Sequence, residues 1–375
     1  MNYRVRVLAI LAAFTVLGGC ASGPPVTPQP PLVASERSRP GASDGATLYV
    51  AEYSAKSLPS IAQYRIDDGS LVRRIVVGEY GIGALAVDRS GTLYIIENSY
   101  SHDRYRDRLV EYAPGATKPA RTIVKDQWQP IAMLFNGAGD LYVLDRTSKL
   151  REFKPGATQA YEVVTDGLDD PTSMTIDPNG TVYVANAVAK KHSWGSVTVY
   201  AGGRHLVATI VDQILAPSGV ALDGRGTLYV ADPIGYGAPD YRSIAQYSTV
   251  DGRFLRTTTV TQNPNAQMSP GLAADSSGKI YTHLGGCFEI VGGPAHCVNK
   301  VIVYPPGATT PSRVYELGKG EAFLGLRLDP AANMYLAVCR RTPGAGCTVR
   351  VYGKGKSPRT ILRVPQTLGA MAIAP

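Results

Sequence analysis

The sequence predicts an all-β fold, a seven-bladed β-propeller built from four-stranded antiparallel blades, and three observations carry that prediction. First, an apolar-Tyr-apolar strand core recurs seven times after residue 45, at spacings of 41 to 54 residues. Repeats of this length with strand-forming residues are typical of propeller blades. Second, the 375-residue chain holds 40 Gly and 27 Pro, which suits many short strands joined by tight turns. Third, the C-terminal segment reads as one further strand that can close a ring.

The apolar-Tyr-apolar core is the second strand of each repeat. Its copies are centred on Tyr49, Tyr94, Tyr142, Tyr183, Tyr229, Tyr281 and Tyr335. Further aromatic residues end the third strands, at Tyr64, Tyr112, Phe153, Tyr200, Tyr247, Tyr304 and Tyr352. Blades bury both faces against their neighbours, and large flat side chains at equivalent points fill that space. We therefore interpret most of the 22 tyrosines as scaffold and not as a stacking platform for sugars or bases.

The other strands of a repeat are equally regular. An inner strand such as GALAVD (83–88) precedes the tyrosine strand, and an Asp-to-Gly turn such as 88–91 joins the two. In that turn the Asp side chain binds its own backbone and Gly takes the positive φ. The fourth strand is rich in β-branched residues, as in ARTIV (120–124) and RTILRV (359–364). Each repeat thus supplies a four-stranded sheet.

Ring closure follows from counting inner strands. The first repeat, at 46–78, lacks an inner strand, whereas residues 368–374 form an unassigned strand of that type. Pairing 368–374 with 47–51 completes the seven blades and removes exposed sheet edges. The propeller is therefore expected to span residues 46–375.

The N-terminus predicts export. Arg4 and Arg6 precede an apolar run from Val7 to Leu17, which is the pattern of a secretory signal and is too short to span a membrane. The ending Leu17-Gly18-Gly19-Cys20 resembles the lipobox of bacterial lipoproteins, which implies a signal peptide at 1–19 and lipid on Cys20. An ordinary secreted protein with an incidental Cys is the alternative. The Pro-rich segment 20–45 cannot bury a core and is expected to act as an extended tether.

Charge excludes one class of partner. The chain carries 38 basic and 30 acidic residues, a net charge of +8, and the charges are dispersed. Nucleic-acid binding requires runs or patches of Lys and Arg, which are missing from this sequence. We expect a monomer attached to a lipid bilayer by its acylated N-terminus, in the bacterial cell envelope and by preference at the outer membrane. Ala21 lacks the acidic residue that would suggest retention at the inner membrane.

The repeat resembles the NHL-type and gluconolactonase-like group of bacterial propellers, which includes lyase-like members. The stretch Gly226-Thr-Leu-Tyr-Val-Ala-Asp232 carries the resemblance most clearly. It implies the propeller architecture. Since such folds serve as sensors, scaffolds, lactonases and lyases, the resemblance does not single out one function.

Four cysteines remain besides Cys20, and an even number in an exported chain indicates disulfides. Three pairings are possible, and because each pair lies between the second and third strands of one repeat we predict Cys287–Cys297 and Cys339–Cys347. A thiolate metal site with His283 and His296 is the alternative, which an oxidising compartment disfavours.

Five repeats carry an oxygen side chain three residues after the repeat tyrosine: Glu52, Glu97, Asp145, Asn186 and Asp232. The two repeats with Leu284 and Val338 there are the two that contain the cysteines. We interpret the five as hydrogen-bonding pins, which disulfides replace in the other two. The alternative is a Ca²⁺ or Mg²⁺ site of a lactonase- or lyase-like enzyme that uses the central channel. The sequence lacks the Glu-Gly-Pro start of the lactonase pattern, and no cofactor is expected.

The longest connections join second to third strands, so they share one face of the disc. They carry the candidate recognition residues Tyr100, His102, Arg104, Tyr105, His192, Trp194, Tyr236, Asp240 and Tyr241. Rigid aromatic residues mixed with charges suit recognition, whereas plain solvated loops are the alternative. No nucleophile elbow, phosphate loop or paired-histidine motif identifies a catalytic residue. We therefore expect a binding or scaffold module for a protein, peptide or glycan.

Overall fold

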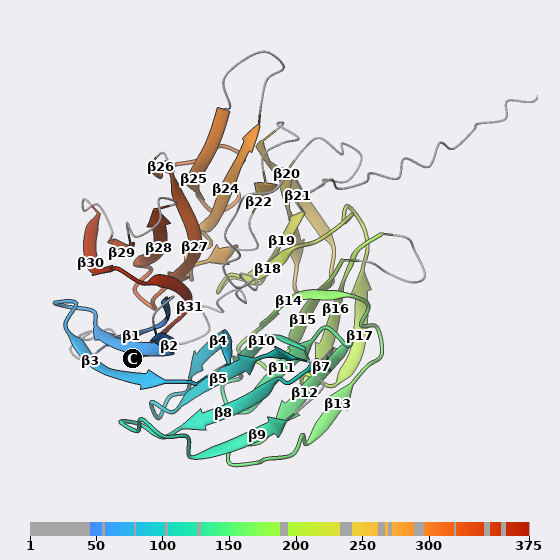
Figure 1. Ribbon diagram of the computed structural model, residues 1–375. Helices are drawn as coiled ribbons and strands as arrows, with labels where there is room; N and C mark the ends of the chain where they lie inside the picture. The colour runs from blue at the N-terminus through green and yellow to red at the C-terminus, as the bar shows by residue number, and fades with distance from the viewer. Residues whose placement is uncertain are drawn as a thin grey trace, which may run out of the picture.

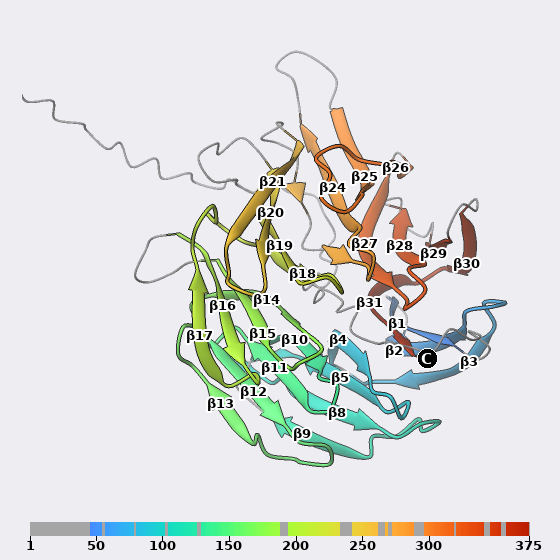
Figure 2. The same cartoon turned by 180° about the vertical axis from the view of Figure 1, so that it is seen from behind.

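The seven-bladed propeller is confirmed. The computed structural model describes residues 46–54, 57–78, 80–101, 104–125, 129–187, 194–232, 242–261, 267–268, 272–288, 296–318, 320–340, 346–353 and 358–374. Seven antiparallel sheets stand around a central axis, and the colour runs once around the ring (Figures 1 and 2). The described residues contain strands without a helix, so no apolar helix capable of crossing a membrane occurs among them.

Blades are numbered here in chain order, and the strands of each run from the inner to the outer edge. Blade 1 consists of β31 (Thr367–Ala374), β1 (Thr47–Ser54), β2 (Ser57–Arg65) and β3 (Leu71–Val76). Blade 2 consists of β4 (Gly81–Val87), β5 (Leu93–Asn98), β8 (Arg108–Tyr112) and β9 (Arg121–Lys125). Blade 3 consists of β10 (Pro130–Phe135), β11 (Leu141–Asp145), β12 (Lys149–Phe153) and β13 (Glu162–Val164).

The remaining blades repeat this order. Blade 4 consists of β14 (Pro171–Ile176), β15 (Val182–Asn186), β16 (Ser196–Ala201) and β17 (His205–Ile210). Blade 5 consists of β18 (Gly219–Leu222), β19 (Thr227–Asp232), β20 (Arg242–Ser248) and β21 (Phe254–Thr261). Blade 7 consists of β27 (Glu321–Leu328), β28 (Met334–Arg340), β29 (Cys347–Tyr352) and β30 (Arg359–Val364).

Two features were not predicted from the sequence. In blade 6 the inner position holds two short strands, β22 (Gln267–Met268) and β23 (Ala273–Ala274), which both pair with β24 (Ile280–Phe288). Its outer strands are β25 (His296–Tyr304) and β26 (Arg313–Glu316). Between β5 and β8 a small hairpin of β6 (Tyr100–Ser101) and β7 (Arg104–Tyr105) occupies part of a segment expected to be loop.

The last strand closes the ring as predicted. β31 pairs with β1 in antiparallel register, from Thr47 opposite Ala374 to Tyr53 opposite Thr367. On its other side the buried Arg327 of β27 donates through Nε to the Met371 carbonyl, 3.1 Å away. Burial lowers the pKa of Arg327 to about 10. Blade 1 is thus assembled from both ends of the described chain and is clamped to blade 7.

The repeat tyrosines lie where the sequence analysis expected them, buried between blades. Tyr142 and Tyr229 are each 2 % exposed and belong to the apolar clusters between blades 3 and 4 and between blades 5 and 6. The Tyr229 hydroxyl also donates to Asp223, at 3.0 Å. Asp223 in turn accepts the backbone N–H of Thr227, which forms the predicted Asp-to-Gly turn with Gly226 at φ +86°. The repeated tyrosine therefore joins blade packing to the turn.

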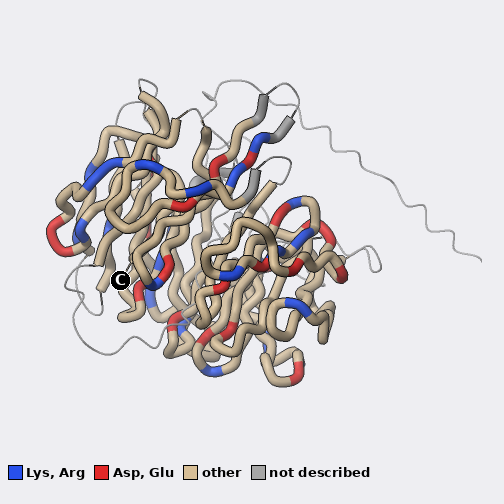
Figure 3. Tube along the Cα trace, turned by 90° about the horizontal axis from the view of Figure 1, so that it is seen from below, with Lys and Arg blue, Asp and Glu red and all other residues tan. Residues whose placement is uncertain are grey.

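Arginines at the outer edge add a second link between blades. Arg73 of β3 donates to the Ala116 carbonyl in blade 2, at 2.7 Å, and Arg121 of β9 donates to the Gly156 carbonyl in blade 3. Arg359 of β30 donates to the Ile66 carbonyl in blade 1, at 3.1 Å. Basic and acidic residues are interspersed over the ring (Figure 3). Much of the positive charge therefore serves the scaffold.

Candidate functional site

The connections between second and third strands all emerge at one end of the blades, together with those that lead from a fourth strand to the next blade. We call this end the loop-bearing face. Antiparallel order places the hairpin β6–β7, the end of β15, the start of β16 and the end of β28 there. A propeller presents such connections on a rigid scaffold, which is where binding residues usually lie.

The candidate recognition residues are only partly described. His102, His192, Tyr236, Asp240 and Tyr241 lie outside the described residues. The backbone register pairs Tyr100 with Tyr105 and Ser101 with Arg104 in the small hairpin. Trp194 is 50 % exposed, directly before β16. Its neighbour Gly195 must be glycine, since a Cβ there would collide with Pro217. Trp194 is thus a large aromatic side chain held at the loop-bearing face by a tight backbone contact.

The five oxygen side chains at the ends of second strands are buried and engaged within the scaffold. In blade 1, Glu52 is 2 % exposed and accepts hydrogen bonds from the Tyr64 hydroxyl, at 2.5 Å, and from Arg74 Nη2, at 2.7 Å. Burial and the Glu52 carboxylate together raise the pKa of Tyr64 far above its usual range. Glu52 therefore ties the second strand to the third and fourth strands.

Blades 2 and 3 use the same combination of carboxylate and guanidinium. Glu97 forms an ion pair with Arg108, whose guanidinium lies 3.9 Å from the centroid of the Tyr80 ring. Desolvation raises the pKa of Glu97 although Arg108 opposes it. Asp145 pairs with Arg151 and accepts from the Thr147 hydroxyl at 2.6 Å. In both blades the buried carboxylate meets a cation from the adjacent third strand.

Blades 4 and 5 direct the corresponding oxygen at backbone N–H groups. The Asn186 amide oxygen accepts from the Asp169 N–H at 3.0 Å. The Asp232 carboxylate accepts from the Leu215 N–H at 2.6 Å. Both N–H groups belong to the connection that enters the same blade. These two residues therefore hold a connection in place on the loop-bearing face.

This donor set does not fit a resident calcium or magnesium ion. Hard cations require several oxygen ligands that converge on one point, whereas each of the five side chains directs an oxygen at a partner in or next to its own blade. A single oxygen of this set, Glu97 Oε1, has no hydrogen-bond partner among the described residues. Among the described residues no group of three or more His, Cys, Asp or Glu side chains is arranged to hold a metal. We derive no catalytic step through a metal.

The cysteines lie at the ends of the two blades that lack such an oxygen. Cys339 and Cys347 are cross-strand partners at the end of β28 and the start of β29, and they form the predicted disulfide. The register of β24 and β25 likewise places Cys287 opposite Cys297, and their bond stays a prediction. In blade 6, His283 stacks on Phe323 of blade 7 with ring centroids 3.9 Å apart. Burial lowers the pKa of His283 to about 4, so this ring is neutral at pH 7.

A second buried carboxyl, for which no ion pair is found among the described residues, lies one residue before Arg108, the partner of Glu97. Asp107 precedes β8, is 1 % exposed, and has an Oδ1 atom that finds no hydrogen-bond partner in the described part of the chain. Desolvation raises the pKa of Asp107 to about 7, opposed by a hydrogen bond from the Ser99 backbone. Asp107 was not predicted as a site residue, because its burial is a property of the folded chain that local sequence pattern does not encode.

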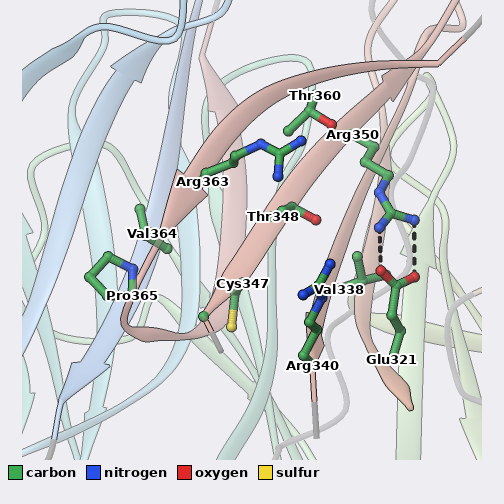
Figure 4. A pocket seen from close by; sticks show the side chains of 11 residues that line it. Glu321, Val338, Arg340, Cys347, Thr348, Arg350, Thr360, Arg363, Val364 and Pro365 are labelled. Atoms are coloured by element: carbon green, nitrogen blue, oxygen red, sulfur yellow. Dashed lines mark hydrogen bonds and ion pairs between the residues drawn. The ribbon is translucent and has the colours of Figure 1, made fainter. Parts of the chain in front are cut away.

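Blade 7 also carries a pocket of about 390 Å³ that opens at the loop-bearing face (Figure 4). Its charged side chains are Arg340, Arg350, Arg363 and Glu321, which gives an excess of positive charge. Glu321 and Arg350 form a two-pronged ion pair, with one contact of 3.0 Å. Burial raises the pKa of Glu321, but hydrogen bonds from Arg350 and the Gly318 N–H, with the charges of Arg350 and Arg340, lower it overall.

The pocket was missed from the sequence, although one signal was present. Val338 stands where five other blades carry an oxygen side chain. Basic residues on the neighbouring strands of blade 7 therefore have no carboxylate at this position to pair with. Arg350 and Arg363 lie 12 and 25 residues beyond Val338, and only the strand register brings them onto one face of the blade.

Comparison with known proteins supports the fold alone. No protein-family model matches the chain, and no curated protein matches it. Among solved structures, the WD40 β-propeller domain of Doa1 aligns with a TM-score of 0.56 at 10 % sequence identity. The alignment covers 83 % of this chain and 98 % of that chain. The protein is therefore a β-propeller, a class that commonly serves as a binding or scaffold module.

Proposed function

We propose that this protein is a binding module of the bacterial cell envelope that captures a protein, peptide or glycan through its loop-bearing face. The observation that carries the proposal is the difference between the ends of the second strands and the connections that follow them. The polar side chains at the ends of the second strands of blades 1 to 5 are buried and each is bound to an internal partner, whereas Trp194 is half-exposed on the same face. The features available to a partner are thus in the connections.

The proposed attachment is lipid on Cys20, followed by the tether to residue 45. One acyl chain gives only marginal membrane binding, whereas the several chains of a lipoprotein-type N-terminus hold the protein stably. The resemblance of residues 17–20 to a lipobox supports this location, with the outer membrane as the favoured site. Replacing Cys20 with Ser should move the protein from the membrane fraction to the soluble fraction, and retention in the membrane would contradict the proposal.

The proposed ligand class excludes nucleic acid, and the protein is proposed to act as a monomer. Interspersed charges, several of which are engaged between blades, leave no continuous basic stripe for a phosphate backbone on the part of the chain that the structure describes. The resemblance to NHL-type and gluconolactonase-like propellers fits such a role, because members of that group include sensors and scaffolds.

A metal-dependent lactonase- or lyase-like activity is the competing hypothesis. It requires stoichiometric metal in the purified protein and a loss of thermal stability in chelator. An ion present at one thousand times its dissociation constant would add about 4 kcal/mol, which a melting assay detects easily. We expect neither effect, because the candidate ligands already have partners.

The binding proposal is tested by site-specific photo-crosslinking in intact envelopes. A photoreactive residue replaces Trp194 on the loop-bearing face, and the matched control replaces Val250, which is 93 % exposed in the hairpin between β20 and β21 at the opposite end of blade 5. We expect a discrete crosslinked partner from position 194 and none from position 250. Equal crosslinking from both positions, or from neither, would contradict recognition through the loop-bearing face.

A further inference from the structure

The charge pattern of blade 7 differs from that of blades 1 to 3. In those three blades a carboxylate at the end of the second strand meets an arginine on an outer strand: Glu52 with Arg74, Glu97 with Arg108 and Asp145 with Arg151. The buried carboxylate and its cation neutralise each other within the blade. Each of these blades therefore has its own anion at this point.

In blade 7 the same position is Val338, so the end of the second strand carries no carboxylate. The strand register aligns Val338, Thr348 and Arg363 in one row across β28, β29 and β30. Thr348 Oγ1 is shielded from solvent and has no hydrogen-bond partner among the residues that the structure describes. This row therefore presents the Thr348 hydroxyl and the Arg363 guanidinium, and it contains no carboxylate that could accept hydrogen bonds from them.

The carboxylate that the pocket does contain is already used. Glu321 forms its two-pronged pair with Arg350, as Figure 4 shows. For Arg340 and Arg363 no side-chain hydrogen bond or ion pair to another described residue is found, although the Arg340 charge acts on Glu321 over a longer distance. In Figure 4 these two guanidinium groups lie on either side of Thr348. The pocket therefore has two cations beyond those that its own carboxylate neutralises.

Three contacts hold this arrangement in place. The Cys339–Cys347 disulfide lies one residue from Arg340 and from Thr348, so it fixes the two strands that carry them. Gly346 takes φ +72°, and a Cβ there would collide with the Val364 carbonyl. Asn299 of blade 6 donates to the Glu321 carbonyl at 2.7 Å. A site whose strands are already fixed loses less conformational entropy when it binds.

We propose that this pocket binds an oxyanion, a carboxylate or phosphate group, which takes the place of the carboxylate that blade 7 lacks. Guanidinium groups match the planar or tetrahedral arrangement of such oxygens and can donate two parallel hydrogen bonds. A volume of about 390 Å³ suits a small anionic molecule or the charged end of a larger ligand. The inference rests on the proposed function in one respect, because it names the ligand chemistry that the loop-bearing face would select.

The test measures binding of inorganic phosphate and of succinate to the full chain in non-ionic detergent, by calorimetry at constant ionic strength, with chloride as the reference. Arg340→Gln and Arg363→Gln should each weaken binding of the preferred anion at least tenfold. The control is Arg253→Gln, since Arg253 is 72 % exposed and contacts Asp251 at the opposite end of blade 5. It should bind like the parent, and all variants should keep the parental melting curve.

Preference for phosphate or for succinate identifies which oxyanion the pocket accepts. Binding no stronger than that of chloride, or binding unchanged in both pocket variants, would overturn the inference. Neither result would affect crosslinking from position 194, so failure of the oxyanion site is distinguishable from failure of the proposed function. Loss of anion binding in Arg253→Gln as well would show a nonspecific charge effect and would also overturn it.

Discussion

Blades 1 and 7 are neighbours in the ring, yet they are held together by different means. Blade 1 combines strands from the two ends of the described chain and ties its second strand to Tyr64 and Arg74 through the buried Glu52. Blade 7 is one continuous segment from Glu321 to Val364 and uses a covalent bond between Cys339 and Cys347 at the corresponding end. Blade 7 also has an ion pair, between Glu321 and Arg350, so the disulfide replaces only the contacts that Glu52 makes at the end of the second strand of blade 1.

The difference teaches where binding capacity can arise in a repeat fold. In blade 1 both oxygens of Glu52 are engaged, one by Tyr64 and the other by Arg74, which leaves neither for a ligand. A disulfide fixes the strands without consuming charge, so Arg340 and Arg363 stay available at the pocket. Stability and recognition are thereby separated in blade 7, whereas in blade 1 the charged groups serve stability alone.

Removing β31 should have the largest effect, because β31 is the inner strand of blade 1 and also packs against blade 7. Deleting residues 367–375 removes the buried Leu368 and Met371 and exposes the edge of β1. Burial of two such side chains contributes about 3–6 kcal/mol, so we expect aggregation or loss of a cooperative melt. Circular dichroism and size-exclusion chromatography measure this outcome. A deletion variant that melts like the parent would mean that ring closure contributes nothing.

Glu52→Val places valine where blade 7 has Val338, but blade 1 has no disulfide at this end among its described residues. It leaves Tyr64 and Arg74 without their acceptor, and we expect a loss of about 3 kcal/mol in the free energy of unfolding. Denaturant unfolding measures it. Asp251→Asn is the control, because the exposed pair Asp251–Arg253, at 3.7 Å, should contribute little to stability. Equal effects of the two substitutions would remove the distinction between the blades.

Breaking the disulfide tests the opposite side of the comparison. Cys339 and Cys347 are separated by 8 residues, and chain-entropy arguments assign about 2–3 kcal/mol to a closed loop of this size. Replacing both cysteines with Ala should lower the free energy of unfolding by that amount and reduce anion binding at the pocket. Peptide mapping without reduction should show the 339–347 link and the predicted 287–297 link. A link between residues 297 and 339 would contradict the local pairing.

Asp107 is a buried carboxyl for which no ion pair is found among the described residues, and desolvation therefore raises its pKa. Its pKa is about 7 in the folded chain, above the 3.8 of an unperturbed Asp, so the folded state binds the proton more tightly. The contribution of Asp107 to the free energy of unfolding is therefore greatest below pH 4 and is lost as the pH rises through 7. Between pH 6 and pH 8 this residue should cost about 1.4 kcal/mol.

Asp107→Asn should remove that dependence. The free energy of unfolding is measured for the variant and the parent at pH 6 and pH 8. The parent should lose stability between the two pH values and the variant should not, so the difference between them should change by about 1.4 kcal/mol in favour of the variant. Asp251→Asn serves again as the control, since hydrogen bonds from Ser248 and the Arg253 N–H lower the pKa of Asp251, which therefore stays ionised from pH 6 to pH 8. An identical pH profile for Asp107→Asn and the parent would mean that Asp107 stays ionised across this range.

The sequence by itself determined the repeat, its period, the order of strands within a blade and the closure by residues 368–374. These follow from local rules: alternating apolar residues, Asp-to-Gly turns and a recurring tyrosine between blades. The same rules predicted the local disulfide of blade 7, because its two cysteines flank one hairpin. They also placed Glu52, Glu97, Asp145, Asn186 and Asp232 at equivalent positions.

Only the tertiary structure decided what those residues contact. The arginines paired with Glu52 and Glu97 lie on different strands of their blades, and Asp232 turns to the connection at Leu215 instead. The pocket depends on the alignment of Val338, Thr348 and Arg363 across two strand pairings, and Asp107 becomes buried only in the folded chain. Strand pattern is local in the chain, whereas register and desolvation depend on contacts between residues far apart in it.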